Sequence, residues 1–294
     1  MRLVAFTLKN ESQSGERTYR IGVLIDGDKI ADFTPSSSGV LATELLRFYD
    51  LDSNFVTVAM DAIEDGRVPL IDVADVKLEA PVPRPGKIIC IGLNYRNHAV
   101  ESGMDIPKSP IIFSKFQTCV VGPEDPIRLP AGSEQVDYEA ELAFVIGRRA
   151  SKVKASDAMD YVFGYTNFND VSARDFQFAD GQWQRGKSCD TFAPMGPFVA
   201  TRDEIADPHN LRISFRLNGE TLQDSTTAEL IFGIPELIEF LSASITLEPG
   251  DVIATGTPPG VGFARKPPIF MKDGDVAEVE VDGLGVLENP VTWS

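Results

Sequence analysis

Residues 137–147 read DYEAELAFVIG, and this stretch indicates both the fold class and the chemistry of the chain. Side chains along a β-strand alternate between two faces, so Asp137, Glu139 and Glu141 would share one face. The other face is an unbroken apolar strip, which predicts that the strand packs against a core on that side. The strand would therefore hold a row of acids against a packed interior.

Glu139 and Glu141 would lie about 7 Å apart along the backbone, close enough for both carboxylates to reach one ion. Two negative charges on a partly buried strand need compensation, and a hard divalent cation with oxygen ligands supplies it. The alternative is a solvated strand end, where two neighbouring glutamates cost nothing. The spacing alone leaves both interpretations open.

The chain after residue 86 consists mostly of short strand patterns separated by glycine and proline. Examples lie at residues 87–92, 111–113, 142–146, 211–217, 252–254 and 276–281, and one convincing helix pattern covers Pro235–Ser244. Regular alternation of strands and helices is absent, so a closed or rolled sheet is expected rather than a doubly wound one. The predicted fold class is α+β, mainly β.

The first part of the chain, residues 1–78, has the pattern of a small α/β unit. Strand patterns at 4–8, 19–25 and 29–32 precede helical spacing at 41–48 and 55–63. The segment APVPRPG at residues 80–86 has prolines at alternate positions, which favours an extended connector. We therefore expect a small N-terminal domain, residues 1–78, and a catalytic domain, residues 79–294.

A second polar cluster reads NFNDVSARDFQ at residues 167–177. Asp170 ends a β-like run and could supply a third carboxylate. Arg174 and Gln177 follow at i+4 and i+7, which would place them on the same helical face. Alternatively, Asp170 caps a helix and pairs with Arg174 on the surface.

Three further positions could take part in chemistry. His98 and Glu101 are three residues apart, so on a helical turn the carboxylate would orient the imidazole as a general base, unless the pair is an incidental surface contact. Lys187, between Gly186 and Ser188, could stabilise a developing oxyanion, or could be an ordinary solvated lysine.

The loop TGTPPG at residues 255–260 has the residues of a rigid loop whose backbone can come close to a ligand. Gly256 permits the backbone to approach a ligand, the prolines restrict the loop, and Thr257 could donate to a ligand oxygen. The loop lacks the GxxxxGK[ST] pattern of a phosphate-binding loop.

Taken together and in this order, these segments resemble the fumarylacetoacetate hydrolase family over residues 80–285. The resemblance implies a β-roll core with a small N-terminal domain, and Mg²⁺ or Mn²⁺ held by Glu139, Glu141 and Asp170. It implies that His98 and Glu101 lie on a lid over the substrate and activate a water molecule. It assigns catalytic roles to Lys187 and Gln177 as well, and substrate contacts to Arg174, Tyr95, Gly256 and Thr257.

One departure narrows the resemblance. The eukaryotic fumarylacetoacetate hydrolase has an additional aspartate ligand before the histidine, whereas Ile91-Gly92-Leu93-Asn94 holds no acid. The chain thus resembles the smaller, three-carboxylate bacterial members that cleave acylpyruvates or 2,4-dioxo sugar acids.

The expected reaction is metal-dependent hydrolysis of a C–C bond in an acylpyruvate, releasing pyruvate and a carboxylic acid. Decarboxylation of oxaloacetate would use the same enolate chemistry, and so would a hydratase or an isomerase of a 2-hydroxy-dienoate. A non-catalytic metal- or ligand-binding protein on the same scaffold is the non-enzymatic alternative.

Composition excludes several function classes. The net charge of −17 disfavours nucleic acid, and no apolar run approaches the ~18 residues of a membrane span. The three scattered cysteines fit free thiols in a reducing compartment. We expect a cytoplasmic homodimer that binds a small anionic 2-oxo acid.

Overall fold

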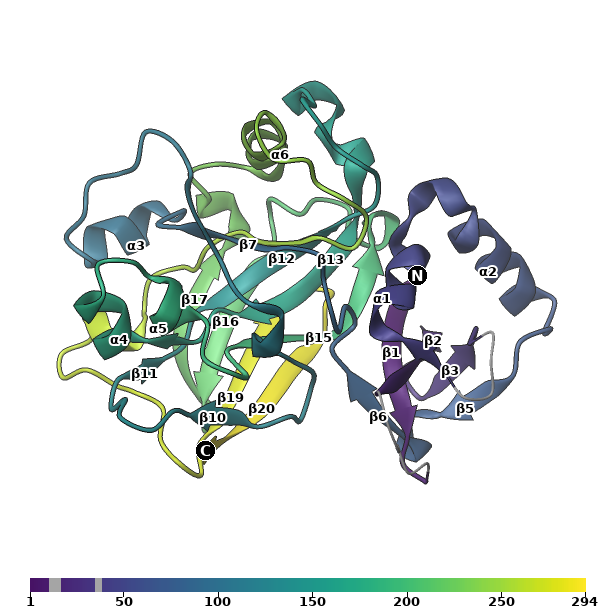
Figure 1. The fold of residues 1–294 in the computed structure, drawn as a ribbon, viewed down its shortest axis with the longest axis horizontal. Coiled ribbons are helices and arrows are strands. Elements are labelled where there is room, and N and C mark those ends of the chain that lie inside the picture. Colours follow the sequence, from purple (N-terminus) through teal and green to yellow (C-terminus); the bar gives the residue numbers. More distant parts are fainter. Residues whose placement is uncertain (11–16, 35–38) are drawn as a thin grey trace.

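The computed structural model describes residues 1–10, 17–34 and 39–294. The remaining residues, 11–16 and 35–38, belong to the expected N-terminal unit and lie outside the described part. Two lobes are visible, a smaller one from the start of the chain and a larger one from the rest (Figure 1).

The small lobe contains six strands and two α-helices within the described residues. They are β1 (Arg2–Leu8), β2 (Thr18–Ile25), β3 (Lys29–Asp32), β4 (Val40–Leu41), β5 (Leu70–Asp72), β6 (Val76–Glu79), α1 (Ala42–Leu45) and α2 (Phe55–Glu64). Asp26 and Gly27 both have positive φ, as the predicted tight turn between β2 and β3 requires.

The large lobe is built mainly from strands. They are β7 (Ile88–Gly92), β8 (Ile111–Ser114), β9 (Val120–Val121), β10 (Ile127–Leu129), β11 (Val136–Asp137), β12 (Ala140–Ile146), β13 (Val162–Asn169), β14 (Ser172–Ala173), β15 (Ala193–Thr201), β16 (Arg212–Leu217), β17 (Glu220–Thr226), β18 (Val252–Ala254), β19 (Val276–Val281) and β20 (Val286–Trp293). Its α-helices are α3 (Arg96–Glu101), α4 (Arg174–Ala179), α5 (Gln184–Lys187) and α6 (Ile234–Ser242).

Strand β12 lies in the middle of the molecule, between β13 and β18 in a mixed sheet. Every residue of β12 is buried, because both of its faces are covered. A single strand over 137–147 is not formed: Asp137 belongs to β11, which pairs with β14, and the ladder to β13 begins at Ala140. The interpretation of the glutamates as a solvated strand end is therefore wrong.

A second sheet, in the order β10-β20-β19-β16-β17, packs against the central strands and completes the rolled core. The ring of Tyr138 stacks on Phe215 of β16, with ring centroids 4.0 Å apart and planes 5° from parallel. Aromatic side chains on both faces of the β12–β13 pair, such as Phe144 and Phe168, are fully buried. The predicted class, α+β and mainly β with a rolled sheet, is confirmed.

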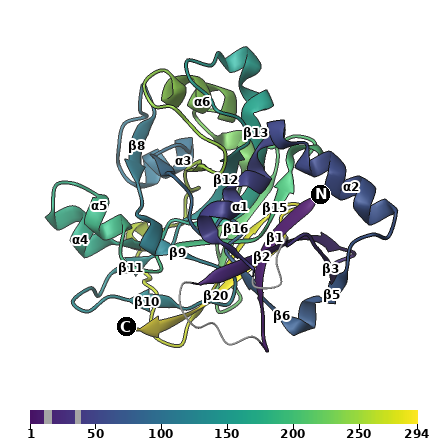
Figure 2. The same ribbon diagram turned by 45° about the vertical axis from the view of Figure 1, so that its right-hand side comes forward.

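The two lobes share a sheet. β1 pairs antiparallel with β15, with Leu3 opposite Val199, so the strands of the small lobe extend the large mixed sheet (Figure 2). The boundary at residue 78 remains a prediction. Among the described helices, none combines the length and the hydrophobicity needed to cross a bilayer.

Candidate active site

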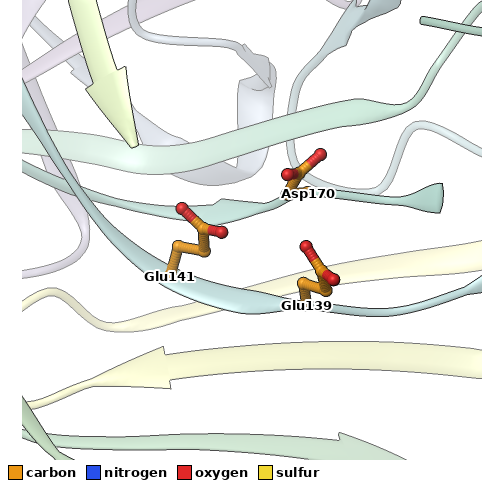
Figure 3. A group of neighbouring side chains, drawn as sticks. All are labelled: Glu139, Glu141 and Asp170. Carbon is orange, nitrogen blue, oxygen red and sulfur yellow. The ribbon is translucent and has the colours of Figure 1, made fainter. Parts of the chain in front are cut away.

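Three buried carboxylates meet at one end of the β12–β13 pair. Glu139 directly precedes β12, Glu141 lies within it, and Asp170 directly follows β13. Ala140 pairs with Asn169, and the backbone N–H of Asp170 donates to the carbonyl of Glu139 at 2.9 Å, which fixes their relative position. One oxygen from each carboxylate lies within 4.8 Å of the others, and the three groups point toward a shared space (Figure 3). None of the three is more than 5% exposed.

Two buried lysines neutralise part of this charge. Lys187 donates to Oε2 of Glu139 at 2.6 Å and to Oδ2 of Asp170 at 2.8 Å. Lys115, which follows β8, donates to Oδ1 of Asp170 and, at 3.0 Å, to the carbonyl of Val171. The interpretation of Lys187 as a solvated lysine is wrong, because its side chain is 3% exposed.

The pKa values of the two glutamates shift in opposite directions. Burial acts to raise the pKa of Glu139, but Lys187 and Arg174 outweigh burial and hold that pKa well below its usual range. Burial raises the pKa of Glu141 well above its usual value, and the charges of Asp170 and Glu139 raise it further. Within the described residues, Glu141 makes no ion pair with lysine or arginine. Its Oε2 accepts a hydrogen bond from the backbone N–H of Gly256 at 2.8 Å.

This donor set fits a hard divalent cation. All three groups are carboxylate oxygens, the ligands that Mg²⁺ and Mn²⁺ prefer. A cation beside Glu141 would also supply the positive charge that this buried carboxylate lacks. The geometry therefore allows Glu139, Glu141 and Asp170 to hold one divalent cation.

Arg174 links the triad to the surrounding loops. It donates to Asp137 Oδ2 at 2.8 Å, to Glu139 Oε1 at 2.6 Å and to Gln177 Oε1 at 3.0 Å. The predicted shared helical face of Asp170, Arg174 and Gln177 is not formed, because only the last two belong to α4. The alternative Asp170–Arg174 surface pair is also wrong, since Asp170 pairs with the two lysines.

His98 and Glu101 lie on the short helix α3, and His98 lines the cavity beside the triad. Nδ1 of His98 is 3.5 Å from Oε2 of Glu101. Both oxygens of Glu101 also accept from the backbone N–H of Gly260, at 3.0 and 2.9 Å. His98 is 5% exposed, so the incidental-surface interpretation fails for this residue. The contact with Gly260 fixes α3 against the glycine–proline loop.

A cavity of about 220 Å³ opens beside the triad. Its polar lining consists largely of predicted site residues, namely His98, Glu139, Glu141, Arg174, Gln177, Lys187 and Thr257. Its apolar lining includes Leu93, Met104, Phe113, Phe178, Trp183 and Phe263. The cavity thus combines charged and aromatic lining, with Arg174 over the ring of Phe263 and Lys187 over the ring of Phe113.

Tyr95 and Gly256 lie behind this lining rather than in it. Tyr95 is fully buried, and its hydroxyl has no hydrogen-bond partner among the described residues. Gly256 has φ +100°, and a Cβ there would lie 2.8 Å from Cβ of Asn94, so glycine is required for its N–H to reach Glu141. Their predicted contacts with substrate remain predictions.

Two residues of the site were not predicted as site residues from the sequence. Lys115 closes the charge cluster, and Asp137, predicted only as part of the acidic face, anchors Arg174. Asp137 also accepts the backbone N–H groups of Gly262 at 2.7 Å and Phe263 at 3.1 Å. The position of Asp137 in the DYEAE motif was a usable signal, whereas Lys115 stands in an ordinary loop context.

Comparison with known proteins agrees with this geometry. The family described as "Fumarylacetoacetate (FAA) hydrolase C-terminal" matches residues 87–292, which span the whole site. The chain belongs to the fumarylacetoacetate hydrolase family. Members are enzymes of more than one reaction type, as three relatives illustrate.

The chain is 46% identical over 294 residues to the mitochondrial oxaloacetate tautomerase fahd2 of Xenopus laevis, covering 99% of this chain and 90% of that protein. The structure of a 5-carboxymethyl-2-hydroxymuconate delta-isomerase from Mycobacterium smegmatis is 36% identical, with a TM-score of 0.78 and full coverage of both chains. The maleylpyruvate hydrolase of Sphingobium sp. SYK-6, solved with manganese(II) and pyruvate, is 33% identical, also over both full chains, with a TM-score of 0.81.

Proposed function

We propose that this protein is a divalent-metal-dependent oxaloacetate tautomerase, which interconverts the keto and enol forms of a small 2-oxo acid. The observation that supports this most strongly is the similarity to the fahd2 tautomerase, which extends over nearly the whole chain. This favours the isomerase and oxaloacetate alternatives over C–C bond hydrolysis as the main reaction.

The charge balance of the site supports a small anionic substrate. Four carboxylates, those of Asp137, Glu139, Glu141 and Asp170, face three cations, Lys115, Lys187 and Arg174. With all groups ionised, the cluster has one excess negative charge. A bound divalent ion would reverse that sign, so the site would attract an acid that the surface of the protein, at net charge −17, repels.

Glu139, Glu141 and Asp170 would hold the ion. When bound, it would act as a Lewis acid that withdraws electron density from the 2-oxo group and acidifies the neighbouring C–H. Mg²⁺ and Mn²⁺ both suit these ligands, and the manganese complex of the maleylpyruvate hydrolase supports the second.

The proton movements belong to residues of the chain. Tautomerisation removes one proton from C3 and places one on the 2-oxo oxygen. His98 lines the cavity and can accept the C3 proton, while Glu101 orients the imidazole and stabilises its charged form. Lys187 and Gln177 line the same cavity and can donate hydrogen bonds to the oxygen on which charge develops.

A second candidate is hydrolysis of an acylpyruvate. It is favoured by the His98–Glu101 pair, which could equally activate water, and by the maleylpyruvate hydrolase relative. Decarboxylation of oxaloacetate would use the same charge cluster, but it would not need a base that activates water.

The deciding experiment follows the enol absorbance of oxaloacetate with EDTA, and then with Mg²⁺ or Mn²⁺ restored, while pyruvate and CO₂ are measured in parallel. We expect faster, metal-dependent decay of the enol with no release of pyruvate. Pyruvate with CO₂ would favour the decarboxylase. Pyruvate with a second acid from acylpyruvates, and no effect on the enol, would favour the hydrolase.

Two further assignments concern the assembly and the location of the protein. We propose a homodimer and a cytoplasmic location, the latter to be tested against the mitochondrial designation in the name of the Xenopus laevis relative. Sedimentation of the purified chain and fractionation of the source cells address them separately.

A further inference from the structure

Two hollows of different size share one wall in this structure. The first is the catalytic cavity of about 220 Å³, and the second is an outer groove of about 740 Å³ that runs along β7 and β8. Phe113 and Trp183 line both hollows. None of the three triad carboxylates lines the outer groove, whereas Lys115, which pairs with Asp170, does.

The two shared aromatic side chains contact each other. Their ring centroids are 5.5 Å apart and the planes meet at 73°, an edge-to-face contact that is favourable for aromatic pairs. The ammonium of Lys187 lies 5.0 Å from the centroid of Phe113. Phe113 therefore connects the wall directly to the lysine that contacts Glu139 and Asp170.

Gly92 determines how far the indole of Trp183 enters. A Cβ at Gly92 would lie 2.8 Å from Cζ3 and 3.2 Å from Cη2 of Trp183, closer than side-chain atoms pack. The benzo edge of the indole therefore rests directly on the end of β7. Gly92 and Trp183 both line the catalytic cavity, so this contact forms part of the cavity wall.

We propose that Trp183 sets the maximum length of the substrate, by separating the catalytic cavity from the outer groove. This rests on the proposed function and deepens it, because it names the substrate class as short 2-oxo acids. A hollow of about 220 Å³ lies below the ~300–1,000 Å³ of clefts that hold drug-sized ligands. Once the indole is removed, the distal part of a longer acid enters the groove beside Ile88 and Ile111.

The test compares binding of 2-oxobutanoate, 2-oxohexanoate and 2-oxooctanoate by calorimetry in the presence of Mn²⁺. In the wild type we expect affinity to fall with chain length. In Trp183→Ala we expect the affinity to rise with chain length, by roughly fourfold for each methylene that becomes buried. Trp183→Phe, which keeps part of the wall, should lie between them.

Gln182→Ala is the matched control, since Gln182 borders the outer groove and does not line the cavity. It should keep the wild-type dependence on chain length. Trp183→Leu, which retains apolar bulk, replaces the alanine variant if that variant does not fold. An unchanged length dependence in every folded Trp183 variant would overturn the proposal.

Fluorescence tests whether a ligand reaches the wall at all. The chain has two tryptophans, and Trp293 is 59% exposed, so Trp293→Phe leaves Trp183 as the single emitter. Binding of 2-oxobutanoate should shift its emission, and an unaltered spectrum at saturation would contradict the contact.

Neither binding readout requires turnover. If the wild type fails to accelerate loss of the oxaloacetate enol but the length dependence still inverts in Trp183→Ala, the proposed reaction fails and the role of Trp183 stands. Normal tautomerase activity with no inversion of the length dependence would support the proposed reaction and refute the role of Trp183.

Discussion

The ammonium of Lys187 lies 2.6 Å from Oε2 of Glu139, with both side chains almost fully buried. Without Lys187, Glu139 keeps only Arg174 and Asp170 keeps only Lys115, and breaking a buried ion pair typically costs about 3–5 kcal/mol. We therefore expect Lys187→Met to lower the free energy of unfolding by about that amount in EDTA. A divalent ion should recover part of the loss, because it supplies the missing charge.

Urea denaturation with EDTA and with Mn²⁺ measures this difference. Arg149→Met is the control, because it removes an exposed pair with Glu248, worth up to ~1 kcal/mol, far from the triad. An equal loss for Lys187→Met under both conditions would show that Lys187 and the ion do not share the same carboxylates.

Glu141 provides the sharpest test of the metal site, because within the described residues it has no cationic partner. Glu141→Gln should abolish the stabilisation that Mg²⁺ or Mn²⁺ gives the wild type, which would be about 2.7 kcal/mol at a hundredfold excess over Kd. Thermal unfolding with increasing metal measures it, and the surface change Glu248→Gln should behave like the wild type. Undiminished stabilisation in Glu141→Gln would remove Glu141 from the ligand set.

His98 is expected to be the base of the reaction. His98→Ala should lower kcat for enol–keto interconversion by ~10²–10⁴, the range usual for general-base catalysis, with a small change in KM. Metal stabilisation should persist in this variant, which separates loss of the base from loss of the ion. A kcat within a few-fold of the wild type would assign the proton transfer to another group.

Glu101 should remain ionised in moderately acidic solution. Burial acts to raise its pKa, but the hydrogen bonds from His98 and from the N–H of Gly260 outweigh burial and lower it. Because the folded-state pKa lies below the unfolded value of about 4.3, the stabilising contribution is complete above that value. It is lost as the pH falls through the folded-state pKa.

The carboxyl carbon NMR signal of Glu101 should therefore remain that of the ionised form from about pH 7 to pH 5. It should shift only at lower pH, where the carboxylate becomes protonated. A signal that already shifts between pH 7 and pH 5 would mean that the pKa of Glu101 is not lowered.

Asp137 holds Arg174 and the loop around Phe263, whose ring lies 4.5 Å from the Arg174 guanidinium. An amide at position 137 places N–H groups opposite backbone donors and leaves hydrogen bonds unsatisfied. We expect Asp137→Asn to cost about 1–3 kcal/mol of stability and to raise KM. Asp224→Asn, at an exposed pair with Arg212, should change neither by much, and equal effects of the two variants would refute a positioning role.

Local sequence predicted much of the fold. Strands β18 and β19 occupy the predicted residues 252–254 and 276–281, and the helix expected at Pro235–Ser244 is α6, which begins and ends one or two residues earlier. These elements could be predicted because hydrophobic periodicity and turn residues are signals that extend over only a few neighbouring residues. The break between Asp137 and Ala140 was missed because nothing in the local pattern shows that β11 pairs with a distant strand.

What the sequence by itself determined is the set of chemical groups and their order: three carboxylates, a histidine with a nearby glutamate, a lysine and a rigid glycine–proline loop. Only the tertiary structure decided which charges meet. Lys115 reaches Asp170 across 55 residues, and Trp183 closes a cavity against Gly92 because that glycine has no side chain. Such contacts depend on how distant segments of the chain pair and pack against one another, and local spacing does not specify that pairing.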